Sequence, residues 1–191
     1  MYKALLLKKI KQHISRGGII AYPTEACYGL GCDPLNYKAI KKIIQLKRRN
    51  KDKGMIAVAD RLIRFNKLIM PYDHETQNFI NSTYWNELNH KNKQAYSIIY
   101  DLKPTVFSKI NGKFNSLAIR VSKHKALNQL CHYLKIPISS TSANISGKHT
   151  IKNYRNCVKQ FGNNVMVLKG DIGFYKKPSS IIDTIKQIIL R

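Results

Sequence analysis

The sequence predicts an α/β fold in which helices flank a sheet of mixed parallel and antiparallel strands. Short apolar segments of strand length alternate with longer segments of helical period along the 191 residues. In the middle of the chain, Asn111-Gly112 is a reversal signal between strand-like segments, which favours antiparallel pairing there. The sequence has no internal repeat and no linker-like stretch. Residues 1–191 are therefore expected to form one domain around one core.

The first part of the chain is expected to form helices and buried strands in alternation. Apolar residues spaced by four, at Leu6, Ile10 and Ile14, give the first helix one buried face. Asn36 is a good N-cap for the second helix, which ends near Lys47. In order, the expected elements are a helix at Lys3–Arg16, a strand at Ile19–Tyr22, a helix at Asn36–Lys47, a strand at Met55–Ala59 and a helix at Asp60–Leu68.

The stretch Pro23–Pro34, between the first strand and the second helix, is expected to be a shaped loop. It contains two prolines and two glycines, which disfavour continuous regular structure. Ligand-binding loops commonly follow strands in open α/β sheets. A turn in which Thr24 bonds its own backbone is an equally good interpretation of the spacing.

The second part of the chain is expected to contain more strands than helices. The segment Pro71–Lys93 is polar and weakly periodic, and it is expected to be helix or loop. The expected elements after it are strands at Ala95–Tyr100, Thr105–Ile110 and Leu117–Val121, a helix at Ala126–Leu134, a strand at Ile136–Ser139, a helix at Asn153–Phe161, a strand at Val165–Leu168 and one or two strands at Ile181–Ile189.

The charge is strongly basic and points to anionic partners. The chain has 34 Lys and Arg against 10 Asp and Glu, which gives a net charge of +24. Such a field attracts polyanions, so nucleic acid and phosphorylated small molecules are plausible partners. The lysines are scattered along the whole chain, and a compositional bias is an alternative source of the excess. The charge therefore supports RNA contact without establishing it.

The cysteines and the amino terminus indicate a reduced, soluble protein. Cys27, Cys32, Cys131 and Cys157 form no Cys-x-x-Cys pair, and no paired histidine spacing accompanies them. No metal site made of protein side chains is predicted. The apolar run Ala4–Leu7 is too short for a signal peptide or a membrane span, so a cytoplasmic protein without membrane contact is expected.

Three polar stretches are candidates for a ligand site. Ser139–Gly147 holds six small hydrogen-bonding side chains within eight positions, more than a helix cap or Ser/Thr turn needs. The basic run Lys47–Lys53 is either a solvated face or a phosphate site. Arg120 can grip a phosphate or carboxylate in bidentate fashion. No Ser-His-Asp or Cys-His arrangement is evident, so the inventory favours catalysis by positioning and charge neutralisation, as in transfer at phosphorus.

Several stretches in this order resemble the threonylcarbamoyl-AMP synthase family, in the short form of its YrdC/TsaC type. The stretches are Ala21–Asp33 (AYPTEACYGLGCD), Leu46–Arg49 (LKRR), Leu117–Val121 (LAIRV), Ser140–Gly147 (STSANISG) and Pro178–Asp183 (PSSIID). Together they cover nearly the whole chain, and their combination is highly specific for that family.

The resemblance implies a twisted mixed sheet enclosing a large, positively charged cavity. It also implies a nucleotidyltransferase that joins L-threonine, bicarbonate or CO2, and ATP into threonylcarbamoyl-AMP and releases diphosphate, with Mg2+ accompanying ATP. The product would feed the threonylcarbamoyl modification of adenosine 37 in tRNAs that read codons starting with A. Other proteins of that pathway, and tRNA itself, are the implied partners.

The resemblance also assigns roles to individual residues. The family's Lys-x-Arg motif falls on Lys47 and Arg49, which are expected to point into the cavity, and its Ser-x-Asn motif falls on Ser142 and Asn144. These four are the expected catalytic residues. The expected threonine-binding residues are Thr24, Lys53 and Arg120. The expected ATP-binding residues are Lys47, Arg49, Thr105, Ser140, Ser142, Asn144 and Ser179.

Two departures from the family pattern and two alternative functions accompany this assignment. Asn50 stands where the family often has proline, and Asp101–Pro104 replaces a usual Pro-Gly-Pro segment, which puts in doubt a nucleotide contact by that loop. A non-catalytic protein that binds tRNA or double-stranded RNA is the main alternative, supported by the charge. Carbamoyl transfer from carbamoyl phosphate is a nearer one, but the zinc-finger and acylphosphatase parts that accompany it are missing from this sequence.

Overall fold

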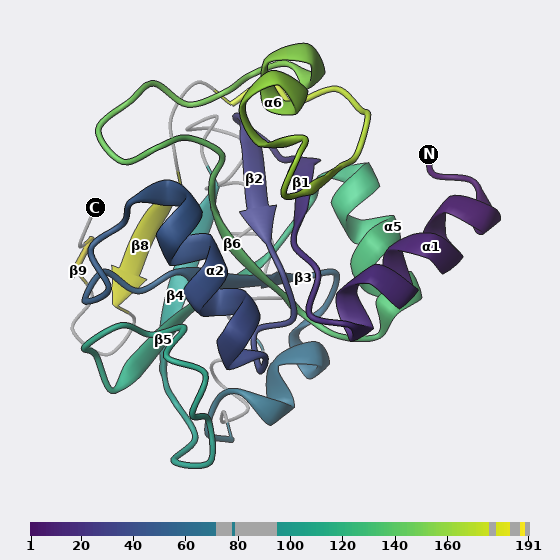
Figure 1. Cartoon of the computed structure of the whole chain (residues 1–191). Helices are drawn as coiled ribbons and strands as arrows, with labels where there is room; N and C mark the ends of the chain where they lie inside the picture. Colours follow the sequence, from purple (N-terminus) through teal and green to yellow (C-terminus); the bar gives the residue numbers. More distant parts are fainter. Residues whose placement is uncertain (72–77, 79–94, 176–178, 184–187, 190–191) are drawn as a thin grey trace.

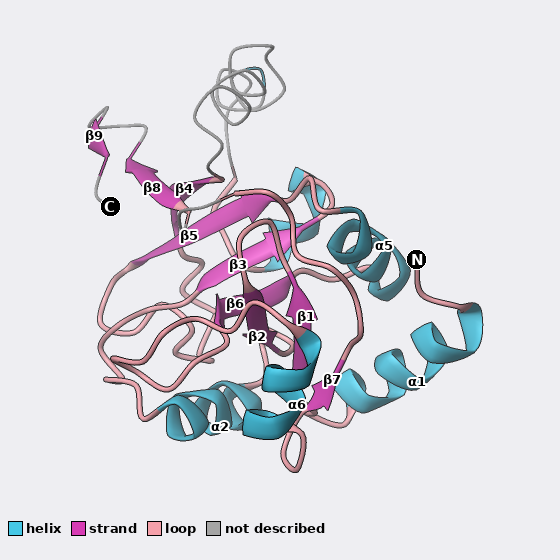
Figure 2. Ribbon diagram, turned by 90° about the horizontal axis from the view of Figure 1, so that it is seen from above, coloured by secondary structure: helices cyan, strands magenta, loops and turns pink. Residues whose placement is uncertain are grey.

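Strands from the whole length of the chain assemble into a mixed sheet (Figures 1 and 2). The computed structural model describes residues 1–71, 78, 95–175, 179–183 and 188–189. The described strands are β1 (Ile20–Pro23), β2 (Tyr28–Gly31), β3 (Ile56–Ala59), β4 (Tyr96–Asp101), β5 (Ser116–Val121), β6 (Ile138–Ser142), β7 (Met166–Val167), β8 (Ser180–Asp183) and β9 (Ile188–Ile189). Their order across the sheet is β7-β1-β2-β6-β3-β5-β4-β8-β9. Neighbours are parallel in three pairs and antiparallel in five, so the predicted mixed sheet is confirmed.

The helices begin and end close to the positions that the apolar periodicity predicts. The described helices are α1 (Ala4–Ser15), α2 (Tyr37–Lys47), the short 3-10 helix η1 (Leu62–Lys67), α5 (Lys125–Leu134) and α6 (Tyr154–Phe161). The Asn36 side chain accepts a hydrogen bond from the backbone N–H of Ala39 at 2.9 Å, which confirms it as the N-cap of α2. None of the helices in the described ranges has the length and apolar character that a membrane crossing requires.

The two faces of the sheet pack against different helices, because side chains alternate along each strand. On β1, Ile20 and Tyr22 pack with the apolar stripes of α1 and α5. On the opposite face, Ala21 packs in the core that also contains the buried residues of α2, η1 and α6. Figures 1 and 2 show α1 and α5 side by side, away from α2 and α6. The result is the helix-covered α/β architecture that the sequence predicts.

The stretch Pro23–Pro34 is not the continuous loop that its prolines and glycines suggested. Its middle forms β2, which pairs with β1 in an antiparallel hairpin whose last pair is Pro23 with Tyr28. The two glycines of the stretch, Gly29 and Gly31, lie inside β2, and Gly31 permits close approach of the neighbouring strand β6. Glycine here marks tight strand packing rather than a turn.

Two other expected elements differ from the structure. Thr105–Ile110 is not a strand, although Val106, Ser108 and Ile110 are buried in alternation with exposed neighbours. Burial does alternate along this segment, but the segment forms no β-ladder with any of the described strands. An alternating pattern of apolar residues was therefore not enough to predict a strand. The helix expected at Asp60–Leu68 is the shorter η1, and the Asp60 carboxylate contacts Arg61 and Arg64 at 3.0 Å instead of capping it. The segment expected to be helix or loop at Pro71–Lys93 lies almost entirely outside the described residues.

Replacing Gly31 with alanine is expected to destabilise the sheet by about 3 kcal/mol. A Cβ at Gly31 would lie 2.1 Å from the backbone oxygen of Ser139, and a backbone atom in a ladder cannot move aside. Gly147→Ala is the matched control, because Gly147 has a φ of +79° but nothing within 4 Å of its Cβ position. That control is expected to lose only the ~1 kcal/mol of left-handed strain. Urea unfolding of both variants measures the difference, and equal losses would contradict the packing argument.

Candidate functional site

A cavity of about 610 Å³ opens on one face of the sheet. This is the face that α1 and α5 cover, because Ile138 of β6 packs in their core while Ser140 and Ser142, two and four residues further on, line the cavity. On β3, Val58 and Ile56 are divided in the same way. The described lining residues are Thr24, Glu25, Ala26, Cys27, Gly29, Arg49, Gly54, Met55, Ile56, Ala95, Ile99, Asn111, Phe114, Ser116, Ala118, Arg120, Ser140, Thr141, Ser142, Thr150, Lys152, Tyr175, Ser179 and Ile181.

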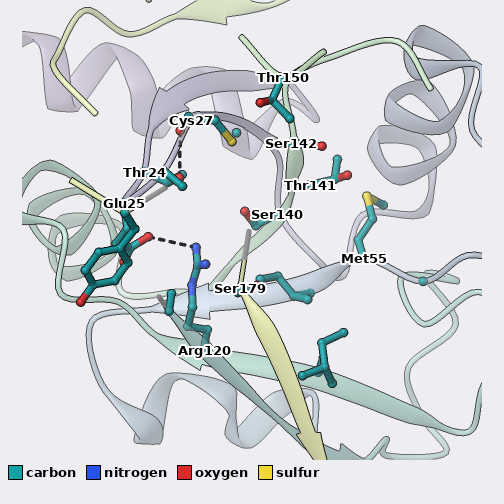
Figure 3. Close-up of a pocket in the computed structure, with 18 of the residues that line it drawn as sticks. Thr24, Glu25, Cys27, Met55, Arg120, Ser140, Thr141, Ser142, Thr150 and Ser179 are labelled. Carbon is teal, nitrogen blue, oxygen red and sulfur yellow. Dashed lines mark hydrogen bonds and ion pairs between the residues drawn. The ribbon is translucent and has the colours of Figure 1, made fainter. Parts of the chain in front are cut away.

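The turn of the β1–β2 hairpin forms one wall of the cavity. Thr24 donates its hydroxyl hydrogen to the backbone oxygen of Cys27 at 2.8 Å, which is the self-bonded turn that the spacing allowed (Figure 3). The hydroxyl oxygen of Thr24 keeps its capacity to accept a hydrogen bond. Burial raises the pKa of the Cys27 thiol, and the charges of Arg120 and Lys47 offset this only in part. Cys27 is therefore a lining residue rather than a reactive thiolate.

A buried ion pair joins this turn to the middle of the sheet. Arg120 of β5 lies 3.3 Å from a carboxylate oxygen of Glu25, and each residue is 7% exposed (Figure 3). The Ser122 hydroxyl donates to the other Glu25 oxygen at 2.5 Å. Burial by itself would raise the pKa of Glu25, but Arg120 and the Ser122 hydrogen bond together hold that pKa below its ordinary value.

The depressed pKa of Glu25 gives a pH prediction with a definite sign. A carboxylate whose pKa is lower in the folded state stabilises the fold above its ordinary pKa, roughly 4.3 for glutamate, and loses this contribution as the pH falls towards the folded value. The unfolding free energy of the wild type is expected to exceed that of Glu25→Gln most at pH 7, and the difference should shrink steadily below about pH 4. Urea unfolding of both proteins at pH 7, 5 and 3.5 measures it. A difference that is constant across this range would contradict the assigned ion pair.

The carboxyl end of β6 supplies hydroxyl groups on the opposite side of the cavity. Figure 3 shows Thr141, Ser142 and Thr150 on that side and Ser140 between them and Arg120. Thr150 is held there by its neighbour Ile151, whose backbone oxygen accepts from Tyr28 N–H at 2.8 Å and whose N–H donates to the Ala143 oxygen at 3.2 Å. The dense Ser/Thr run therefore begins inside the strand rather than after it, and its side chains reach the cavity.

Lys47 does not point into the cavity as the motif suggested. Its side chain is 1% exposed, and its ammonium group donates to the backbone oxygens of Ser142 and Asn144 and to the amide oxygen of Asn144. These three acceptors use all three N–H donors of an ammonium. Burial and the nearby Arg49 charge lower the pKa of Lys47 to about 8. Lys47 thus connects the C-terminus of α2 to the C-terminal end of β6 by hydrogen bonds.

Asn144 belongs to the same hydrogen-bond network as Lys47 and Ser142. Its amide oxygen accepts from the Ser142 hydroxyl at 2.7 Å as well as from Lys47, and its amide nitrogen donates to the backbone oxygens of Ile145 and Lys148 at 3.0 and 2.6 Å. Asn144 is buried and is not among the cavity-lining residues, whereas Ser142 is. Of the Ser-x-Asn motif, only the serine faces the cavity.

Arg49 is the member of the Lys-x-Arg motif that lines the cavity. It follows the left-handed residue Arg48 (φ 49°), which ends α2 and reverses the chain direction. The guanidinium donates to the backbone oxygens of Lys53 and Gly54 at 3.1 and 2.7 Å, which fixes its plane beside the cavity. Arg48 itself is exposed.

The structure gathers some of the predicted site residues and leaves others outside. Thr24, Arg49, Arg120, Ser140, Ser142 and Ser179 line the cavity. Lys53 and Thr105 are exposed and do not line it; Lys53 contributes its backbone oxygen to Arg49. Sequence reasoning missed Glu25 and Lys152, which both line the cavity. A glutamate inside a candidate loop of a chain with 10 acidic residues was the available signal for Glu25.

Comparisons with known proteins agree with the motif resemblance. A threonylcarbamoyl-AMP synthase of Methylobacillus flagellatus is 36% identical over 181 residues, which cover 94% of this chain and 96% of that protein. One from Histophilus somni is 37% identical over 186 residues, with 97% and 96% covered.

Solved structures share the fold. The structure of P. abyssi Sua5 complexed with L-threonine matches with a TM-score of 0.86 at 22% identity; the match covers 100% of this chain but 55% of that one, so this chain spans about half of it. E. coli YciO matches with a TM-score of 0.77 at 16% identity, over 100% and 90% of the two chains. The family model for Sua5, YciO and YrdC, described as telomere recombination, matches residues 12–191. The chain belongs to the Sua5/YciO/YrdC family.

Proposed function

We propose that the protein is a threonylcarbamoyl-AMP synthase, a nucleotidyltransferase that joins L-threonine, bicarbonate or CO2, and ATP and releases diphosphate. The observation that carries this proposal is the 36–37% identity to synthases of that name over nearly the whole of both chains. A cavity of about 610 Å³ is within the size range of small-molecule sites, and it supports a reaction among small substrates.

The lining of the cavity is divided in a way that suits ATP and threonine together. Apolar side chains from β3, β4 and β8, namely Ile56, Ile99 and Ile181, make a surface suited to a nucleoside. Three basic side chains and one acidic side chain are among the described lining residues: Arg49, Arg120, Lys152 and Glu25. The excess of positive charge and the hydroxyls of Ser140, Thr141 and Ser142 suit phosphates and a carboxylate.

The proposed mechanism relies on orientation and charge stabilisation. The neutral amine of threonine adds to CO2 and releases a proton to solvent, and an oxygen of the resulting carbamate attacks the α-phosphorus of ATP while the bond to diphosphate breaks. Arg49 and Arg120 stabilise the negative charge, and the Thr24 and Ser142 hydroxyls orient the substrates. Ser140 and Ser179 remain proposed ATP contacts, since both line the cavity. We assign Lys47 and Asn144 the task of holding Ser142 in place, since their polar groups bond the protein itself.

Magnesium fits this site as a companion of ATP. Among the residues that the structure describes, no three His, Cys, Asp or Glu side chains are grouped to hold a metal ion. Glu25, the acidic side chain among the described lining residues, is engaged by Arg120 and Ser122. Mg2+ is commonly bound through substrate phosphates and water, and there it would neutralise charge on the leaving diphosphate.

We further propose that the product serves threonylcarbamoyl modification of tRNA in the cytoplasm, together with other proteins of that pathway. The alternative of a non-catalytic RNA-binding protein is favoured by the net charge of +24. A salt titration separates the two, because affinity for RNA falls steeply with salt whereas turnover of ATP need not.

The decisive experiment uses the purified protein with ATP, L-threonine, bicarbonate and Mg2+. Threonine-dependent release of diphosphate and a product with the mass of threonylcarbamoyl-AMP are expected. Serine and valine in place of threonine serve as controls for the amino acid. Folded protein that gives neither diphosphate nor the product would overturn the proposed activity and leave RNA binding as the better function.

A further inference from the structure

Glu25 is a buried carboxylate in a cavity built for anionic substrates, and the proposed reaction gives it no task. An acid beside phosphates and a carboxylate repels the substrates, so its presence needs a reason. We propose that Glu25 is a positioning residue that fixes the orientation of the Arg120 guanidinium towards the carboxylate or phosphate of a bound substrate. This inference rests on the proposed function and deepens it by naming how one substrate anion is held.

The contacts of Glu25 show that the carboxylate serves the protein rather than a ligand. One oxygen accepts from the Ser122 hydroxyl at 2.5 Å. The other oxygen is shielded from solvent and lies 3.3 Å from Arg120. Both oxygens therefore lie against groups of the protein, and Glu25 acts on the cavity through Arg120.

Glu25 is itself held from several directions. The Ser122 oxygen accepts from the His124 N–H at 3.1 Å, so the hydroxyl hydrogen of Ser122 is aimed at Glu25. The backbone oxygen of Glu25 accepts from Tyr175 N–H at 3.0 Å, and the neighbouring Thr24 oxygen accepts from Gly173 N–H at 2.8 Å. A carboxylate fixed in this way can hold one end of the Arg120 guanidinium in place.

The position of Arg120 in the sheet allows the orientation of its guanidinium to be set by Glu25. It projects from β5, an inner strand paired on both sides, so its backbone is rigid. Its side chain lines the cavity while one terminal nitrogen contacts Glu25. A guanidinium carries five N–H donors in a fixed fork, so the ion pair at one terminal nitrogen draws that end of the group towards Glu25, and the buried Nε–H, which bonds no protein atom in the described part of the chain, is left for a ligand.

Loss of the Glu25 charge should therefore affect catalysis and binding differently. Arg120 stays positively charged in Glu25→Gln, and the repulsion between Glu25 and the substrate anion disappears, so affinity for the anion should not fall. The orientation of the guanidinium is lost, and misplacement of a bound substrate lowers turnover. Loss of Arg120 itself removes the contact and weakens binding of the substrate that it holds.

The test compares Glu25→Gln, Arg120→Met and the double variant by steady-state kinetics and thermal melting. Glu25→Gln is expected to lower kcat on the order of 10- to 100-fold without raising either KM. Arg120→Met is expected to raise one KM at least about 10-fold, on the scale of a lost charge-assisted hydrogen bond. If that KM is for L-threonine, the anion is its carboxylate; if it is for ATP, the anion is a phosphate. Glu25→Asp should recover part of kcat.

The double variant tests whether Glu25 acts only through Arg120. Adding Glu25→Gln to Arg120→Met should cause no further loss of kcat, and it should raise the melting temperature relative to Arg120→Met, where the buried carboxylate has lost its partner. Asp33→Asn, which removes a carboxylate outside the cavity lining, is the control for charge alone. Independent, multiplicative losses in the double variant would overturn the inference.

Other outcomes are equally decisive. A higher KM for threonine with unchanged kcat in Glu25→Gln would mean that Glu25 contacts the substrate, which also overturns the positioning role. If Glu25→Gln does not fold, Ser122→Ala loosens the same carboxylate and should show the same fall in kcat with unchanged KM. If the wild type makes no threonylcarbamoyl-AMP, the proposed function fails; calorimetric binding of diphosphate and of L-threonine to the same variants still measures the coupling between Glu25 and Arg120.

Discussion

Lys47→Ala is expected to lose both stability and turnover. The substitution leaves two backbone oxygens and one amide oxygen without their buried ammonium donor. The Ser142 oxygen keeps the Asn144 N–H at 3.0 Å and the Asn144 amide oxygen keeps the Ser142 hydroxyl at 2.7 Å, so the loss comes from the hydrogen bonds to a charged donor and from the Asn144 backbone oxygen. Hydrogen bonds to charged groups contribute about 1.5–3 kcal/mol each, and partial relaxation should leave a net loss of about 3 kcal/mol. For a chain of this size that loss lowers the melting temperature by about 6–12 °C. Turnover should fall on the order of 100-fold, because Ser142 moves when its anchor is removed.

Melting curves and diphosphate release on the same preparations measure both effects. Lys41→Ala is the matched control, since Lys41 is an exposed lysine of the same helix and its loss should change stability by less than about 0.5 kcal/mol. A Lys47→Ala protein with a normal melting temperature and lost turnover would return Lys47 to the role of a direct substrate contact, as its motif implies.

Arg49→Ala should show the opposite balance, with a large catalytic loss and a small loss of stability. Arg49 is partly exposed and lines the cavity, and removing one preorganised cationic donor costs on the order of 10²- to 10³-fold in turnover. Arg49→Lys should recover little of this, because a lysine cannot bond both the Lys53 and Gly54 oxygens and still present a planar group.

The neighbouring Arg48 provides the control for Arg49. Arg48→Ala removes the same charge from an adjacent, exposed position, so its turnover should stay within about 2-fold of the wild type, in line with the small effects of exposed substitutions. Threonine-dependent diphosphate release at saturating ATP compares the two. Equal losses at both positions would mean that net charge, rather than a placed guanidinium, drives catalysis.

The sequence predicts α1, α2, α5 and α6 well, because each has an apolar stripe, whereas the helix expected at Asp60–Leu68 is the shorter 3-10 helix η1. Asn36 and Asn153 cap α2 and α6 as their residue type indicates. The strand β2 was not predicted because glycine normally marks turns, whereas Gly31 makes room for the backbone of β6. The role of such a glycine depends on a neighbouring strand that is distant in sequence, and that neighbour is known only once the sheet is assembled.

The candidate site was predictable as a set of segments but not as a set of side-chain directions. The segments around Thr24, Arg49, Arg120 and Ser140 meet at one cavity. Whether a residue faces that cavity depends on contacts that a motif does not contain. Lys47 lies two positions before Arg49, yet the left-handed turn at Arg48 sends the two side chains to different surroundings.

One face of β6 contributes both to the core and to the cavity, and this constrains the register of the strand in the sheet. Ile138 is fully buried against α5, while Ser140 and Ser142 on the same face line the cavity. A slip of the strand by one residue would take Ile138 out of the core that it shares with α5, and it would take the buried Ser139 hydroxyl away from the backbone N–H and oxygen of Cys32, which it contacts at 2.9 and 3.2 Å. The packing of Ile138 therefore favours the alignment in which Ser140 and Ser142 face the cavity. The positions of these cavity-lining hydroxyls are thus set by a core residue that does not itself line the cavity.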